Sequence, residues 1–370
     1  MNAPRLQVDL GKIFHNASTL VERLKTQNIS VTGVTKAFLG TPQIAQTMLR
    51  AGVTSLGDSR IENIEHMRRS GIAGQMALIR SPMLSQTDRV VASADISFNT
   101  EHDVMAALSS AAVKARKTHG VLLMVELGDL REGFMPQDVE RAVQTVCKLP
   151  NIKFMGLGTN LACRSGVSPD DNNMAELSAL AAQIAHIDQP CDIVSGGNSS
   201  NLEWIFAGGK VGYVNNLRLG EAILLGRETL NRQPVHGLFT DAISLITEVI
   251  ESKAKPSQPW GRIAQSAFGS SSSDTDRGEI QQAIVAIGRQ DTDPDGLFPA
   301  SDIKVLDTSS DHLVLSADTR KLAVGSEVSF QLNYSALLRA MTSPHIAKTF
   351  INHNVTALLP RNIQTLPDAA

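Results

Sequence analysis

Short apolar runs alternate with amphipathic stretches over the first 235 residues of the chain. The amphipathic stretches place apolar residues three and four positions apart, which is the period of one helix face. Runs such as Val121-Leu-Leu-Met-Val125 do not alternate with polar residues, and this is typical of parallel strands buried on both faces. Strands are predicted at 30–36, 54–58, 76–80, 94–98, 121–126, 153–159, 191–195 and 212–218, and helices at about 9–26, 101–117, 137–148 and 174–186.

Eight strands separated by helices over roughly 200 residues predict an α/β fold, a (β/α)8 TIM-type barrel. A doubly wound open sheet stays an alternative, because a count of strands does not show closure, but no GxGxxG motif follows the first strand. Beyond about residue 236 the pattern alternates, as in His312-Leu-Val-Leu315, and Gly, Asp, Ser and Pro clusters separate the runs. The prediction is a barrel over 1–235 and a mostly antiparallel β C-terminal domain over 236–370.

Composition narrows the class of protein. The formal net charge is −3 and the charges are well mixed, so neither nucleic acid nor an anionic membrane surface is an expected partner. The N-terminus has no apolar signal region, and no apolar run reaches the ~18 residues of a membrane span. Three cysteines suit a reducing compartment, and no CxxC or HExxH spacing suggests a metal. A cytoplasmic protein without a metal site is expected.

The ends of several predicted strands carry chemically useful side chains, and barrel enzymes place their chemistry at these ends. The first strand closes with Lys36, and a desolvated lysine amine is the group that Schiff-base chemistry requires. A lysine snorkelling into solvent is the alternative interpretation of that position. The seventh strand runs into Ser195-Gly-Gly-Asn198-Ser199-Ser200, whose backbone N–H groups and hydroxyls form an anion cradle. An ordinary capped loop would have a similar composition.

The strand-end lysine and the anion cradle together indicate a particular cofactor more specifically than either motif does alone. A strand-end lysine and a phosphate cradle within one barrel suggest pyridoxal 5′-phosphate, with its aldehyde on Lys36 and its phosphate at 198–200. Two further strand ends carry charged segments, Glu126-Leu-Gly-Asp-Leu-Arg131 and Asn215-Asn-Leu-Arg218-Leu-Gly220-Glu221.

With these motifs the chain resembles the alanine racemase superfamily, whose members are pyridoxal-phosphate enzymes with an N-terminal barrel and a C-terminal β domain. It is most similar to the ornithine racemase-like branch, and the resemblance covers nearly the whole chain. The motifs that carry it are Thr35-Lys-Ala, Met124-Val-Glu-Leu-Gly-Asp-Leu-Arg-Glu-Gly133, Gly158-Thr-Asn-Leu-Ala162, Ser195-Gly-Gly-Asn-Ser-Ser200, Asn216-Leu-Arg-Leu-Gly-Glu-Ala222 and Ala286-Ile-Gly-Arg-Gln-Asp291.

The resemblance implies a role for each matched position. Lys36 would be the Schiff-base lysine and one proton-transfer base, and Arg218 would lie against the pyridine nitrogen, where a cation disfavours protonation. Arg131 would lie near the substrate carboxylate, although a solvated charge in an acidic turn is the competing interpretation. The phosphate would be held by Ser199, by the backbone of Gly220 and Glu221, and by Tyr334, which could instead be a core aromatic.

One position departs from the family pattern. Alanine racemases carry a tyrosine in the C-terminal domain that supplies the second base across a dimer interface, and the matching position here is Phe268, which cannot carry a proton. Asp311 and His312 occupy positions that the family places near the substrate carboxylate, and Cys163 lies just beyond the sixth strand. The sequence does not rank these three as the second base, and Asn160 stands where alanine racemases have a barrel histidine.

The function expected from the resemblance is a homodimeric racemase of a basic amino acid, ornithine or lysine. The acidic turn around Asp291 and Asp293 could bind the side-chain ammonium, although exposed turns favour Asp and Gly for backbone reasons. An alanine or broad-specificity racemase and a non-catalytic pyridoxal-phosphate-binding homeostasis protein are the alternatives. A barrel decarboxylase or aldolase is a weaker third.

Overall fold

The computed structural model describes residues 4–187, 189–268, 276–317 and 321–353. Within them the chain divides into two compact units, Leu10–Thr240 and a second unit made of residues 4–9 with Asp241–His353. The division therefore falls after Thr240 rather than after residue 235. The N-terminal strand also belongs to the second unit, whereas the sequence assigned it to the barrel.

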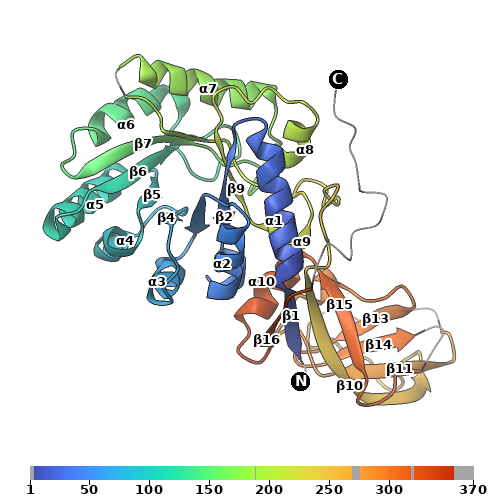
Figure 1. The fold of residues 1–370 in the computed structure, drawn as a ribbon. Coiled ribbons are helices and arrows are strands. Elements are labelled where there is room, and N and C mark those ends of the chain that lie inside the picture. The colour runs from blue at the N-terminus through green and yellow to red at the C-terminus, as the bar shows by residue number, and fades with distance from the viewer. Residues whose placement is uncertain (1–3, 188, 269–275, 318–320, 354–370) are drawn as a thin grey trace. The chain divides into compact units, whose positions relative to one another are not determined.

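The larger unit is a closed barrel of eight parallel strands in the order β2 to β9, so the predicted barrel is confirmed and the open sheet is excluded (Figure 1). The strands are β2 (Ser30–Val34), β3 (Ser55–Asp58), β4 (Gln75–Leu78), β5 (Ile96–Asn99), β6 (His119–Met124), β7 (Ile152–Gly158), β8 (Ile193–Ser195) and β9 (Asn216–Leu219). The helices are α1 (Leu10–Lys25), α2 (Pro42–Arg50), α3 (Ile61–Arg69), α4 (Thr87–Ser93), α5 (His102–Ala115), α6 (Val139–Val146), α7 (Asp171–Ala185), α8 (Asn201–Phe206) and α9 (Glu221–Leu225).

Strand β6 shows why the apolar runs do not alternate. Val121 and Leu123 pack with residues of α6 and α7, whereas Leu122 and Met124 join a separate cluster of strand residues that includes Phe98. Successive side chains of a strand point to opposite faces, so both faces of β6 are buried. The helices form the outer layer, and the carboxyl ends of all eight strands open at one end of the barrel.

The second unit is an antiparallel sheet in the order β12-β15-β10-β11-β14-β13, as the alternating pattern predicted. Its strands are β10 (Ile243–Pro256), β11 (Glu279–Val285), β12 (Leu297–Phe298), β13 (Ile303–Thr308), β14 (Leu313–Ala317), β15 (Glu327–Leu332) and β16 (Ala347–Ile351), with helix α10 (Tyr334–Thr342) after β15. Strand β1 (Arg5–Asp9) pairs antiparallel with β10 and parallel with β16, which explains why the first residues join this unit.

No helix among the described residues is long and apolar enough to cross a membrane.

Candidate active site

Lys36 lies just beyond β2, which ends two residues earlier than predicted. Thr35 adopts a helical backbone conformation, and a short 3-10 helix (Lys36–Phe38) begins at Lys36 itself. The turn closes because the Thr35 backbone N–H donates to the Gly57 carbonyl at 2.9 Å. The Lys36 side chain is half-buried, and it forms no hydrogen bond or ion pair with the described residues.

A buried carboxylate behind this turn fixes its shape. Asp58 is fully buried at the end of β3, where its Oδ2 accepts the Thr35 hydroxyl at 2.6 Å. Its Oδ1 accepts the Arg60 backbone N–H at 2.9 Å and the Asn63 amide at 3.0 Å. Burial raises the pKa of Asp58, and these three donors oppose the increase. Asp58 therefore orients the residue that precedes Lys36.

The segments after β8 and β9 form the predicted cradle. The backbone N–H groups of Ser199, Gly220 and Glu221 donate no hydrogen bond to any described residue, so all three remain available to an anion. Ser199 is buried, and its hydroxyl accepts the Ala222 backbone N–H at 3.3 Å, which ties the two segments together. The Ser200 hydroxyl is buried without a partner among the described residues.

Asn198 shapes the cradle rather than adding a free donor to it. Its Oδ1 accepts the Ser200 backbone N–H at 2.8 Å, and its amide donates to the Leu161 carbonyl at 3.0 Å and to Asn160 Oδ1 at 3.2 Å. Gly197, with φ of +143°, makes this turn possible, since a Cβ there would lie 2.3 Å from Asn201 Oδ1.

Arg218 on β9 is a buried cation without a carboxylate partner among the described residues. Its guanidinium donates to Ser195 Oγ at 2.5 Å, to the Thr159 carbonyl at 2.7 Å and to Asn160 Oδ1 at 3.3 Å, all of them neutral groups. Burial lowers the pKa of Arg218 to about 10. The arrangement leaves a positive charge uncompensated at the carboxyl end of the strands.

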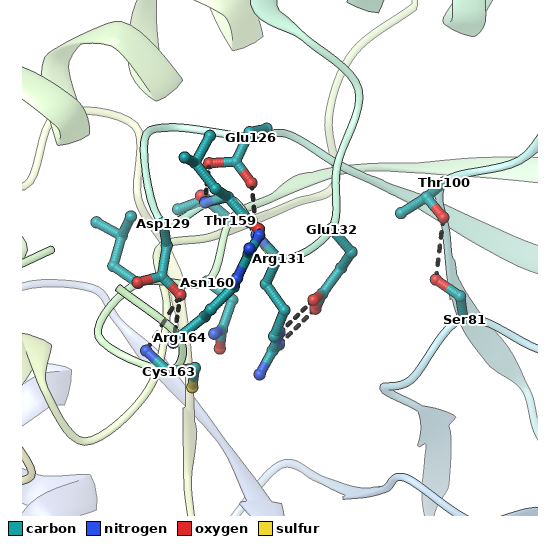
Figure 2. Close-up of polar contacts among 12 residues, drawn as sticks. Ser81, Thr100, Glu126, Asp129, Arg131, Glu132, Thr159, Asn160, Cys163 and Arg164 are labelled. Carbon is teal, nitrogen blue, oxygen red and sulfur yellow. Dashed lines mark hydrogen bonds and ion pairs between the residues drawn. The ribbon is translucent and has the colours of Figure 1, made fainter. Parts of the chain in front are cut away.

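Two loops at this end of the barrel are tied together by acidic residues (Figure 2). Glu126 accepts the backbone N–H groups of Gly128 at 2.6 Å and Leu130 at 2.8 Å, which folds the loop that carries Arg131. Asp129 accepts three backbone N–H groups of the next loop, from 163 to 165, at 2.9 to 3.2 Å. Burial raises the pKa of Asp129, but the backbone hydrogen bonds that it accepts lower the pKa by more, so the net direction is downward.

Arg131 is exposed, and its Nε and Nη2 donate to the two oxygens of the Glu132 carboxylate (Figure 2). Burial lowers the pKa of Arg131, whereas the Glu132 bonds and the nearby Cys163 and Asp129 charges raise it, with a net increase. Cys163 is an exposed free thiol whose Sγ lies 3.7 Å from the Asn198 amide nitrogen. The structure thus brings Arg131, Cys163, Asn198 and Arg218 to the same end of the barrel.

The remaining predicted residues lie in the second unit. Tyr334 is half-buried at the start of α10, where Asn333 caps the helix. Asp311 is exposed, and the bond that His312 Nδ1 makes to it at 2.7 Å lowers the pKa of Asp311. Asp291 is buried and accepts the Ser343 hydroxyl at 2.6 Å, so it is not the exposed turn residue that its sequence suggested. Whether these side chains serve the site stays a prediction.

Sequence reasoning missed Ser195 and Asn216 as site residues. Ser195 lies on β8 and bonds to Arg218 of the neighbouring strand β9, and Asn216 of β9 bonds in turn to Ser195. Polar residues within strands of an otherwise apolar barrel were the available signal. No group of three or more His, Cys, Asp or Glu side chains that could hold a metal occurs within the described ranges.

The strand-end lysine, the free N–H cradle and the buried guanidinium define a barrel with an anion-binding site at its carboxyl end. The model of the alanine racemase N-terminal domain matches residues 8–228, and the chain belongs to that family. It is 36% identical to an ornithine racemase from Acetoanaerobium sticklandii over 94% of this chain and 99% of the relative. It is also 36% identical to a lysine racemase from Thermotoga maritima, over 94% and 98% of the two chains.

A solved structure supports the same fold. An alanine racemase from Clostridium difficile 630 matches with a TM-score of 0.75 at 16% identity, over 96% of this chain and 97% of that one. At this identity the likeness concerns the fold alone, a closed parallel barrel with an antiparallel β unit.

Proposed function

We propose that this protein is a pyridoxal 5′-phosphate-dependent racemase that interconverts the L and D forms of a basic amino acid, ornithine or lysine. The observation that carries the proposal is the 36% identity, over 94% of the chain, to relatives named as ornithine and lysine racemases. The site at the carboxyl end of the barrel supports the proposal, because Lys36, Arg131 and Arg218 all lie there.

The described residues fit the cofactor. Three free backbone N–H groups at Ser199, Gly220 and Glu221 suit a phosphate, and the unpartnered Ser200 hydroxyl is a further donor beside them. The half-buried Lys36, which forms no hydrogen bond or ion pair with the described residues, would bind the aldehyde. When bound, the cofactor supplies an electron sink that acidifies the α-hydrogen of the amino acid.

Lys36, Arg131 and Arg218 would each have a separate role in the reaction. Lys36 would take the α-proton from one face and return it, since its amine is the base nearest to the bound aldehyde. Arg131 would bind the substrate carboxylate through its guanidinium fork, in exchange for its present contact with Glu132. The charge of Arg218 would disfavour protonation of the ring nitrogen, which favours return of the proton over transfer of the amino group.

A second proton carrier is required on the opposite face of the α-carbon. Phe268 cannot serve, and Asp311, His312 and Cys163 remain the candidates. Cys163 has the strongest support within the barrel unit, because its Sγ lies beside Asn198, at the same end of the barrel as Arg131 and Arg218.

A basic substrate also needs a partner for its side-chain ammonium. We propose that Asp291 or Asp293 of the partner subunit in a homodimer binds this ammonium. We also propose that the enzyme acts in the cytoplasm. A contact between the ammonium and a partly desolvated carboxylate contributes about 1–3 kcal/mol, which corresponds to roughly tenfold discrimination or more against alanine.

Incubation of the purified protein with each L-amino acid, followed by chiral chromatography, tests the activity. We expect D-ornithine or D-lysine to form, whereas preferential formation of D-alanine would favour the broad-specificity alternative. Borohydride treatment should attach the cofactor to the peptide that contains Lys36, and attachment to another lysine would refute that assignment. Cofactor binding without conversion of any amino acid would favour the homeostasis protein.

A further inference from the structure

A chain of hydrogen bonds runs from Arg218 into the interior of the barrel. Arg218 Nη1 donates to Ser195 Oγ at 2.5 Å, and Ser195 Oγ donates to Asn216 Oδ1 at 2.7 Å. Asn216 Nδ2 lies 3.0 Å from Thr32 Oγ1, whose other contact is Ser55 Oγ at 2.8 Å. All five side chains are buried, and they come from four strands, β9, β8, β2 and β3.

The direction of the bonds from Arg218 through Ser195 and Asn216 to Thr32 is determined. A guanidinium only donates, so Ser195 accepts from Arg218 and has one proton left to donate to Asn216. The Ser30 hydroxyl already donates to the Asn215 carbonyl at 2.8 Å, so at 3.1 Å from the Asn216 side chain it can only accept. The nitrogen of the Asn216 amide must therefore face Ser30, which leaves its oxygen facing Ser195.

This arrangement holds Arg218 as a donor without neutralising it. Ser195 and Asn216 carry no charge, and Ser195 has no second proton that it could donate toward the guanidinium. The other end of the guanidinium donates to the Thr159 carbonyl. A carboxylate in place of Ser195 or Asn216 would orient the guanidinium equally well but would offset its charge.

We propose that Ser195 and Asn216 are positioning residues that hold Arg218 with its charge uncompensated, and that they thereby control whether the bound amino acid is racemised or loses its amino group. The inference rests on the proposed function. In the side reaction one water supplies the keto oxygen of the 2-oxo acid that leaves, and the amino group stays on the cofactor as pyridoxamine phosphate. The two electrons that the substrate loses reduce the cofactor, and the Lys36 amine is released, so no further oxidant or reductant is needed.

Asn216→Asp and Ser195→Ala test the inference. Asn216→Asp places a carboxylate two hydrogen bonds away from Arg218. Ser195→Ala removes one of the acceptors of the Arg218 guanidinium. We expect each variant to raise the ratio of 2-oxo acid formed to D-amino acid formed by about tenfold, the effect of one pKa unit at the ring nitrogen. We also expect the visible absorption spectrum of the reconstituted protein to change, while KM changes little.

Ser97→Ala is the matched control, because Ser97 is an equally buried strand serine that bonds to His119 and Asn99 rather than to Arg218. Ser195→Thr keeps the hydroxyl and should restore the wild-type ratio. If Ser195→Ala does not fold, the nearly isosteric Asn216→Asp still decides the question. An unchanged ratio and spectrum in Asn216→Asp would overturn the inference. A wild-type protein that neither binds pyridoxal phosphate nor racemises would instead overturn the proposed function.

Discussion

The three cationic side chains at the carboxyl end of the barrel differ in the number and charge of the groups that they contact. Arg131 is paired with Glu132 in an exposed loop, whereas Arg218 is buried among neutral acceptors. Lys36 forms no hydrogen bond or ion pair with the described residues, and its charge acts on Glu221 only at longer range. An exposed ion pair contributes little and can be exchanged for a substrate carboxylate. Burying a charge costs free energy unless hydrogen bonds stabilise it. The conformation of Arg218 therefore depends more on its hydrogen-bond partners than that of Arg131 does.

Cys163 is the residue at which we expect the second proton transfer. Cys163→Ala should lower racemisation by about 10²–10⁴-fold, the usual contribution of a positioned acid or base. Lys36 would still exchange the α-hydrogen on its own face, so deuterium from D2O should enter one enantiomer only. Proton NMR of each enantiomer incubated in D2O measures this.

Cys191→Ala is the control, because Cys191 is a free, half-buried cysteine outside the cluster of site residues. Full racemisation by Cys163→Ala would transfer the role to His312 or Asp311, which the same isotope measurement can distinguish.

Asp291 and Asp293 are the residues that we expect to select a basic substrate. Each accepts a serine hydroxyl, from Ser343 at 2.6 Å and from Ser335 at 2.5 Å, and asparagine keeps an oxygen that can accept the same bond. Asp291→Asn and Asp293→Asn therefore remove only the charge. If either carboxylate binds the ammonium, KM for lysine or ornithine should rise about tenfold while alanine activity stays unchanged.

Ser343→Ala is the complementary control, since it removes the hydrogen bond and keeps the carboxylate. An unaffected KM in both asparagine variants would show that this turn does not recognise the substrate.

The barrel strands could be predicted element by element because most of their residues are buried on both faces, which gives short apolar runs that do not alternate. The end of β2 was predicted two residues too late, because the turn after Val34 depends on bonds from Thr35 to residues of β3. Strand β1 was missed, since its partners β10 and β16 lie more than 230 residues later in the chain. The Ser195–Asn216 bond was missed for a different reason, because it depends on the register between the neighbouring strands β8 and β9, which the sequence pattern does not give.

Strand β6 carries a histidine whose burial makes stability depend on pH. His119 is 1% exposed at the start of β6 and bonds to Ser97 of β5 at 2.8 Å. Burial lowers the pKa of His119 to about 4, against the opposing effects of Ala94 and Asp95. His119 therefore binds a proton at a higher pH in the unfolded chain than in the folded chain. As the pH decreases from about 6.5 to about 4, this residue should lower the free energy of unfolding by about 3 kcal/mol.

Urea unfolding of the wild type and His119→Gln at pH 7 and pH 5 measures the effect. The wild type should lose more unfolding free energy than the variant over this interval, and His186→Gln, at an exposed position, should follow the wild type. Identical pH dependence in the wild type and His119→Gln would contradict the assignment.

The predicted site residues belong to both compact units, Lys36, Arg131 and Arg218 to the barrel and Tyr334 and Asp311 to the β unit. In the proposed homodimer, each barrel is completed by the β unit of the other subunit, and each site therefore draws on two chains. Light scattering coupled to size-exclusion chromatography should give twice the subunit mass at assay concentration.

Subunit mixing tests whether the sites are shared. Lys36→Ala and Tyr334→Phe each alter a different unit, and we expect homodimers of either variant to be inactive or strongly impaired. If a site takes Lys36 from one chain and Tyr334 from the other, a mixed dimer has one intact site and one doubly altered site. Random exchange after mild denaturation should therefore recover about a quarter of wild-type activity. Mixing Lys36→Ala with Arg218→Ala, which both alter the barrel, is the control and should recover none. Recovery in neither mixture would show that each site is built from a single chain.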